Sequence, residues 1–158
     1  MCSSDLQRRP TAGQLLARMP RAFRPKLKPD QVRDLGLCHV QNLDAIATGA
    51  AEPPIIWDYV GGVLTWWRVS RLLQLGMPEM DLQLEVATRL VERFGRTGRV
   101  LFVGVDLQAA RTGVMVMDMF AEIVDRASAI AAADWSEVEV CKMAALATEH
   151  HTQEAQAA

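Results

Sequence analysis

The sequence predicts an all-α protein, a bundle of four main helices plus a shorter fifth, preceded by a disordered basic N-terminal arm. Apolar residues recur at helical spacing in several long segments, and prolines and glycines stand where such segments begin and end. Only residues 100–105, with Val100, Val103 and Val105, have the β-branched composition of a strand. Because a single unpaired strand is not stable, this stretch is expected to be an extended buried connector or the lead-in of a helix.

The chain divides into three parts. Residues 1–27 are expected to be a flexible basic arm, because they contain three prolines and one short apolar cluster. Residues 28–147 form the helical bundle domain, and the polar residues 148–158 are expected to be a frayed tail. At 158 residues the chain has the length of one domain with a substantial core.

The segment from Glu52 to Gly76 is expected to be the central helix. Pro53 and Pro54 suit a helix start, and Gly76 suits its C-terminal cap. The first of two stripes along the segment is apolar and consists of Ile56, Val60, Val63 and Trp67. The second is small or polar in its first half and apolar in its second half, and consists of Asp58, Gly62, Thr65, Val69 and Leu72. Two such faces indicate a helix enclosed by neighbours. Gly61 and Gly62 lie in its interior, where each glycine costs about 1 kcal/mol relative to alanine. The expected compensation is close approach of a second helix; the alternative is a hinge or a ligand groove.

The remaining helices follow from the same signals. A helix is expected over residues 29–49, another over 78–94, and a long one over 107–130 with Asp106 as its N-cap. Asp134 and Glu137 have the spacing of a capping box, which predicts a fifth helix ending near residue 147.

Charge is distributed unevenly along a chain whose formal net charge is −2. Residues 1–33 contain eight basic and two acidic residues, whereas the remainder contains nine basic and seventeen acidic residues. Such an arm is expected to bind nucleic acid weakly and without sequence preference, if it binds at all. The arm residues named for this role are Arg8, Arg9, Arg18, Arg21, Arg24, Lys26 and Lys28.

Three widely spaced cysteines argue against a disulfide framework and predict a cytoplasmic location. No run of 18 consecutive apolar residues occurs, so no membrane contact is expected.

Two sets of residues are candidates for chemistry. His39, Asp44 and Asp58 would form a polar cluster with acid–base character if the first two helices pack antiparallel; otherwise they are exposed or satisfy one another. Arg96, Thr97 and Arg99 lie in a glycine-flanked loop that either binds an anion or caps a helix. No metal or cofactor site is predicted: the adjacent histidines His150 and His151 cannot close a four-ligand site.

The stretch 30–46, with His39, and the stretch from Trp57 to Trp66, with Gly61 and Gly62, resemble a group of uncharacterised small proteins of proteobacterial genomes and mobile elements. Some members of that group are labelled Fis-type transcriptional regulators. The resemblance covers about residues 28–146 and implies a bacterial protein, but no particular activity.

The predicted function is protein–protein interaction or regulation, without catalysis. Self-association, most simply as a dimer, is expected because one bundle cannot easily enclose all the large aromatic residues together with the methionine-rich face of the helix over residues 107–130. These aromatic residues are Trp57, Tyr59, Trp66, Trp67 and Trp135. The alternatives are nucleic-acid binding through the arm and an enzyme with a polar site between the first two helices.

Overall fold

The structure, a computed structural model, describes residues 19–20 and 23–157, and the side-chain environments of those up to residue 147. This part of the chain forms five helices: α2 (Pro29–Thr48), α3 (Pro53–Leu73), α4 (Met77–Thr97), α5 (Gly104–Ile123) and α6 (Arg126–Ala157). The all-α prediction is confirmed. The one β feature among these residues is an isolated antiparallel bridge between Lys26 and Asp125. None of the described helices is long and apolar enough to cross a bilayer.

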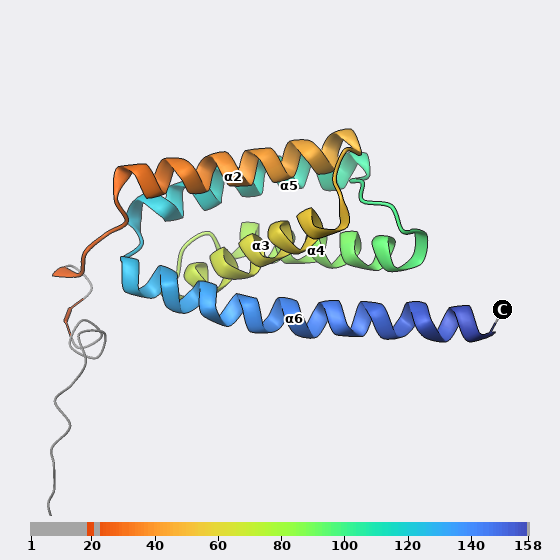
Figure 1. Ribbon diagram of the computed structural model, residues 1–158. Coiled ribbons are helices and arrows are strands. Elements are labelled where there is room, and N and C mark those ends of the chain that lie inside the picture. Colours follow the sequence, from red (N-terminus) through yellow and green to blue (C-terminus); the bar gives the residue numbers. More distant parts are fainter. Residues whose placement is uncertain (1–18, 21–22, 158) are drawn as a thin grey trace, which may run out of the picture.

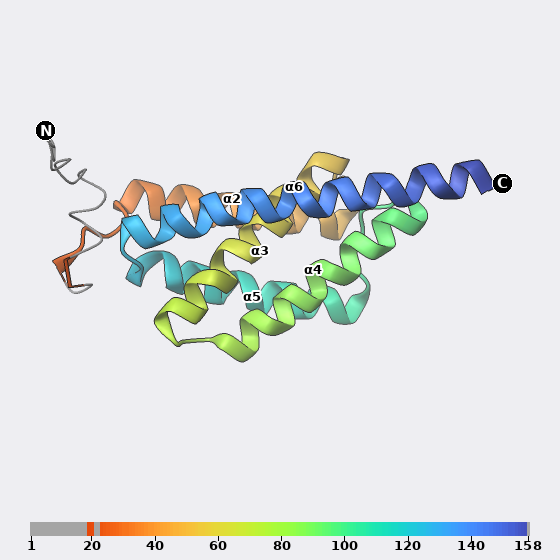
Figure 2. The ribbon, with the colours of Figure 1, turned by 90° about the horizontal axis from the view of Figure 1, so that it is seen from below.

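The helices form layers (Figure 1). α2 and α5 lie side by side on one side of α3 and α4, and α6 covers the other side. Seen from below, α6 crosses the bundle and its C-terminal part runs beyond the other helices (Figure 2).

α3 is the centre of the bundle, as expected, and it contacts each of the other four helices. Its residues Ile56, Val60 and Val63 are fully buried, which confirms most of the predicted first stripe. Tyr59 and Trp66, outside both predicted stripes, are buried as well. A helix with apolar side chains all round is stable only inside such a shell of neighbours.

The corner between α3 and α4 differs from the prediction that Gly76 caps α3. Gln74 takes the left-handed conformation, with φ 56°, and its N–H donates to the carbonyl of Ser70. Gly76, with φ 55°, is instead the N-cap of α4. A Cβ atom on Gly76 would lie 3.0 Å from Phe120 Cζ, so both the backbone angle and the packing favour glycine.

The connector before α5 is extended and partly buried, and Val103 rather than Asp106 is the N-cap. Val100 and Phe102 point into the core, where the Phe102 ring meets Tyr59 edge to face. The predicted N-cap role of Asp106 is wrong. Asp106 lies in the first turn of α5, is 3% exposed, and pairs with Arg89 and Arg93 of α4.

The predicted long helix over residues 107–130 is broken. α5 ends at Ile123, Val124 is extended, and α6 begins at Arg126. Asp125 accepts hydrogen bonds from the backbone N–H and the hydroxyl of Ser128, which is the geometry of an N-cap. The Arg126 N–H also donates to the carbonyl of Pro25. The chain therefore breaks here because a distant segment and a capping aspartate satisfy the freed backbone groups.

The last helix begins earlier and ends later than predicted. Asp134 and Glu137 do not form a capping box, because they lie within α6. With 32 residues, α6 is the longest helix of the described chain rather than a shorter fifth, and it continues through residues 148–157.

Two glycines with opposite surroundings provide a test of this packing. Gly113 of α5 is buried, and a Cβ atom there would overlap the side-chain amide of Gln83. Gln83 cannot easily move, because it donates to the Ala109 carbonyl and accepts from the Tyr59 hydroxyl. Gly113→Ala should lower the free energy of unfolding by about 1–3 kcal/mol in urea denaturation.

Gly95 is the matched control, because it lies within α4 and a Cβ atom there would meet no neighbouring group within 4 Å. Gly95→Ala should raise the free energy of unfolding by about 0.5–1 kcal/mol through helix propensity alone. Equal stability of the two variants would contradict the packing described between α4 and α5.

Candidate functional site

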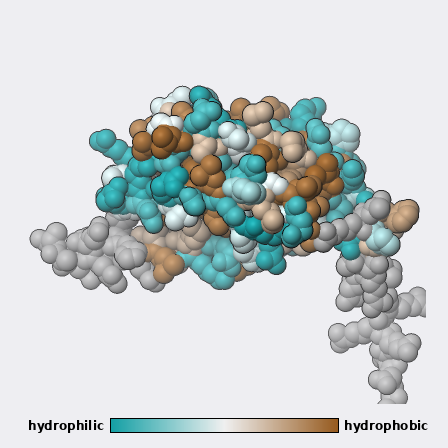
Figure 3. Space-filling model, turned by 180° about the vertical axis from the view of Figure 1, so that it is seen from behind, coloured by the Kyte–Doolittle hydropathy of each residue, from teal (hydrophilic) through white to brown (hydrophobic). Residues whose placement is uncertain are grey.

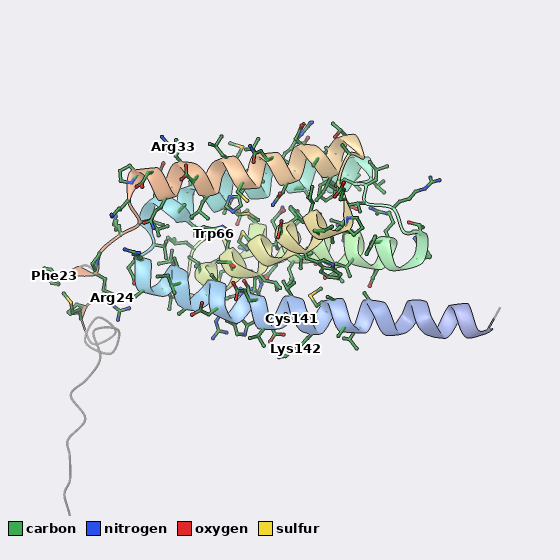
Figure 4. All side chains as sticks on the ribbon, in the orientation of Figure 1. Phe23, Arg24, Arg33, Trp66, Cys141 and Lys142 are labelled. Atoms are coloured by element: carbon green, nitrogen blue, oxygen red, sulfur yellow. The ribbon has the colours of Figure 1, made fainter. Side chains whose placement is uncertain are left out.

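His39 of α2 is the one buried member of the predicted polar cluster of His39, Asp44 and Asp58. It is 9% exposed and lies between α2, α3 and α5. The indole N–H of Trp66 donates to its Nε2 at 3.0 Å, and its Nδ1 lies 3.5 Å from an oxygen of Asp118. Trp66 itself lies in the interior between α2 and α3 (Figure 4).

These partners fix the protonation of the ring. An indole N–H can only donate, so Nε2 carries a lone pair and Nδ1 carries the proton that faces Asp118. Burial lowers the pKa of His39 below its ordinary value of 6.5, while the hydrogen bond and the charge of Asp118 oppose this shift. His39 is therefore held neutral, and both of its nitrogens are engaged inside the protein.

The predicted polar cluster is not assembled. Asp44 and Asp58 are exposed, whereas His39 is buried against Trp66 and Asp118. Within the described residues, no three His, Cys, Asp or Glu side chains converge in a way that could hold a metal ion. The structure thus gives His39 a role in positioning Trp66 and does not place it beside the two predicted carboxylates.

Gly61 and Gly62 are half-buried, and each lies beside a side chain of a neighbouring helix. A Cβ atom on Gly62 would lie 3.7 Å from the His39 ring, and one on Gly61 would lie 3.6 Å from Val140 of α6. These are ordinary contact distances, so alanine fits at both positions but a longer side chain would not.

The predicted anion loop belongs mostly to α4. Arg96 and Thr97 form its last turn, and Gly98 is the C-cap, with φ 65°. The Thr97 hydroxyl donates to the Arg93 carbonyl and accepts from the N–H of Arg99. A helix C-terminus presents carbonyl groups and partial negative charge, so this geometry favours the capping alternative over an anion site.

The basic arm is described only in part. Arg8, Arg9, Arg18 and Arg21 lie outside the described residues. Arg24 approaches Asp125 at 3.9 Å and donates to the Met19 carbonyl, while Lys26 and Lys28 are exposed. The stretch from Arg24 to Lys26 therefore lies against the start of α6.

The aromatic residues are enclosed better than the sequence suggests. Tyr59 and Trp66 are buried, and Trp57, Trp67 and Trp135 are half-buried. Trp67 and Trp135 stack with ring centroids 6.1 Å apart. Apart from Phe23, the large apolar side chains that are exposed in the described part of the chain are aliphatic or methionine, and the largest set lies on α5.

Sequence reasoning missed the ion pairs that the buried Asp106 forms with Arg89 and Arg93. Arg89 donates to one carboxylate oxygen of Asp106 and Arg93 to the other, which joins α4 to the first turn of α5. The spacing of Arg89 and Arg93, one helical turn apart, is a signal that could have indicated a shared acidic partner.

Comparisons with protein-family models, with curated proteins and with solved structures found no match. The surface and the polar groups of this chain are therefore the basis for inferring its function.

Acidification should destabilise the fold through His39. In the unfolded chain His39 binds a proton below pH 6.5, whereas in the folded protein its lowered pKa delays protonation. The stability contribution is thus complete above pH 6.5 and declines as the pH falls toward the lowered pKa. His39→Gln, whose amide oxygen can still accept from Trp66, should show a shallower decline between pH 7 and pH 5 in urea denaturation.

Asp118→Asn is the complementary variant, because it removes the group that opposes the lowered pKa. Its stability should fall more steeply with acidification than that of the unmodified protein. If the unfolding free energy changes with pH equally in the unmodified protein, His39→Gln and Asp118→Asn, the assignment of His39 as a buried neutral ring is contradicted.

A larger side chain at position 62 should disturb the packing around His39. Gly62→Leu would push branched carbons into the His39 ring and should cost about 1–3 kcal/mol of unfolding free energy, while Gly62→Ala should cost little. Thermal denaturation of the two variants provides the comparison. A melting temperature that is unchanged in Gly62→Leu would show that α2 does not pack closely on this glycine.

Proposed function

We propose that this chain is a bacterial, cytoplasmic interaction or regulatory protein that works as a two-fold dimer, with the outer face of α5 as its self-association surface. The observation that supports the proposal is a row of exposed apolar side chains on the outside of α5, called the α5 stripe, which consists of Met115, Met119 and Ile123. Exposed, free Cys38 and Cys141 support a reducing compartment, because thiols persist there. The bacterial origin rests on the sequence resemblance described above.

Three large apolar residues follow one another at one-turn intervals along the outside of α5. Met115 is 71% exposed, Met119 is 59% exposed and Ile123 is 41% exposed. Scattered apolar residues are common on protein surfaces, but a continuous stripe is typical of an interface. Methionine side chains adapt to the surface they meet, which suits a contact between helices.

The neighbouring helix widens this stripe. Gly36 of α2 lies against Asp118 of α5, so the α2 turn with Leu37 and Val40 runs beside the α5 turns with Met115 and Met119. Leu37 and Val40 are 54% and 50% exposed. The face that contains α5 also has several hydrophobic patches separated by hydrophilic side chains (Figure 3).

The charges that border the stripe are complementary to a second copy. If two α5 helices cross in antiparallel orientation near Met117, Met115 of one copy meets Met119 of the other. The same symmetry brings Arg111, at one end of the stripe, near Glu122 of the second copy. Both residues are exposed. This arrangement pairs opposite charges on both sides of an apolar centre, which is the anatomy of a stable interface.

A charge-reversal series tests the proposal at its most specific point. Arg111→Glu should shift the protein from dimer to monomer, because it places two acidic side chains together. The double variant Arg111→Glu, Glu122→Arg should restore the dimer. Analytical ultracentrifugation at several protein concentrations measures the dissociation constant of each, and we expect the single reversal to weaken it by roughly tenfold or more.

Met119→Lys should abolish the dimer outright, whereas Val138→Lys on the outside of α6 is the matched control and should leave it intact. A monomeric unmodified protein would refute the proposal. If Val138→Lys dissociates the dimer and Met119→Lys does not, the interface lies on α6 rather than on α5.

A further inference from the structure

The most distinctive surface outside the α5 stripe is a hollow between the C-terminal half of α3 and the start of α6. It has a volume of about 440 Å³. From α3 it is lined by Arg68, Arg71 and Leu72, and from α6 by the small residues Ser128, Ala131 and Ala132. The hollow exists because the side chains of α6 that line it are small, and the two arginines give it positive charge.

Aromatic rings hold both guanidinium groups in place. Arg68 lies over the ring of Trp135 and Arg71 over the ring of Trp67, each with 5.0 Å between the guanidinium carbon and the ring centroid. The two tryptophans stack on each other. Stacking uses the face of a guanidinium and leaves its N–H edge available for hydrogen bonds.

The hollow has an excess of positive charge. Arg71 donates to Asp81, and the Trp67 indole donates to the same carboxylate, which lowers the pKa of Asp81. Arg68 is exposed and forms no ion pair with any described residue. The Ser128 hydroxyl donates its hydrogen to Asp125, so its oxygen can only accept a hydrogen bond in the hollow. Arg71 therefore has a carboxylate partner, whereas Arg68 has no ion-pair partner among the described residues.

We propose that this hollow is a binding site for an oxyanion, a phosphate or carboxylate group, carried on a small apolar body. A guanidinium group is the side chain best suited to hydrogen-bond a phosphate or a carboxylate, and both arginines line the hollow. Leu72, Ala131 and Ala132 supply an apolar wall for the remainder of the ligand. The site lies on α3 and α6, away from the α5 stripe, and does not depend on dimer formation.

The test uses the full-length protein with arginine side chains labelled for NMR, titrated separately with phenyl phosphate, inorganic phosphate and benzoate. The expected result is a saturable shift of the Nε–H resonances of Arg68 and Arg71. Stronger binding of both phosphates than of benzoate would assign the site to phosphate. Binding of phenyl phosphate and benzoate, but not of inorganic phosphate, would assign it to an organic anion.

Two variants with opposite expected effects make the test specific. Arg68→Gln removes an exposed cation without disturbing the Arg71–Asp81 pair and should weaken binding by roughly tenfold. Asp81→Asn keeps an oxygen for Trp67 but removes the competing charge, so it should tighten binding several-fold. The controls are Arg96→Gln and Glu92→Gln, which make the same charge changes on exposed positions of α4.

The proposal is overturned if the Arg68 and Arg71 resonances do not respond to millimolar ligand. It is also overturned if Arg96→Gln changes the affinity as much as Arg68→Gln does, and Glu92→Gln as much as Asp81→Asn does. Repetition with Met119→Lys separates this site from the proposed dimer: unchanged binding in that variant is expected, whatever its oligomeric state.

Discussion

The enclosure of α3 is the constraint on which the rest of this structure depends. α3 has apolar residues on nearly every side, so no single partner helix can remove them from water. Four helices must therefore surround it, and they do so with short connections. Gly61 lies beside Val140 of α6 and Gly62 beside His39 of α2, each at an ordinary contact distance. The cost of glycine within the helix is offset by the apolar area buried along both contacts.

Polar groups inside the bundle determine how these helices are aligned. Trp66 needs an acceptor in the core, and His39 of α2 provides it. Gln83 of α4 links α3 to α5 through Tyr59 and Ala109, and Asp106 draws the start of α5 onto α4. A buried polar group without a partner is costly, so each of these bonds penalises a shifted alignment. No described buried side-chain nitrogen or oxygen lacks a partner.

Because the interior polar groups satisfy one another, chemistry directed at other molecules belongs to the surface. The α5 stripe and the arginine-lined hollow occupy different helices and have different character, one apolar and adaptable, the other cationic and rigid. The two proposals together assign one face to a second copy of the chain and another face to an anionic group. This division agrees with an interaction or regulatory protein, in which assembly and ligand recognition are separate.

Periodicity and terminal residues, which are local properties of the chain, determined the fold class, the central position of α3 and the beginning of α2 at Pro29. They also predict close packing at Gly61 and Gly62, since a mid-helix glycine needs compensation, and the Gly62→Leu variant tests that prediction. Only the tertiary structure decided where residues distant in sequence meet. The break before Arg126 depends on a hydrogen bond to the Pro25 carbonyl. Asp106 forms ion pairs with two arginines of α4 instead of capping α5. His39 contacts Asp118 rather than Asp44 or Asp58. Such partners are chosen by packing geometry between helices, which local sequence patterns do not encode.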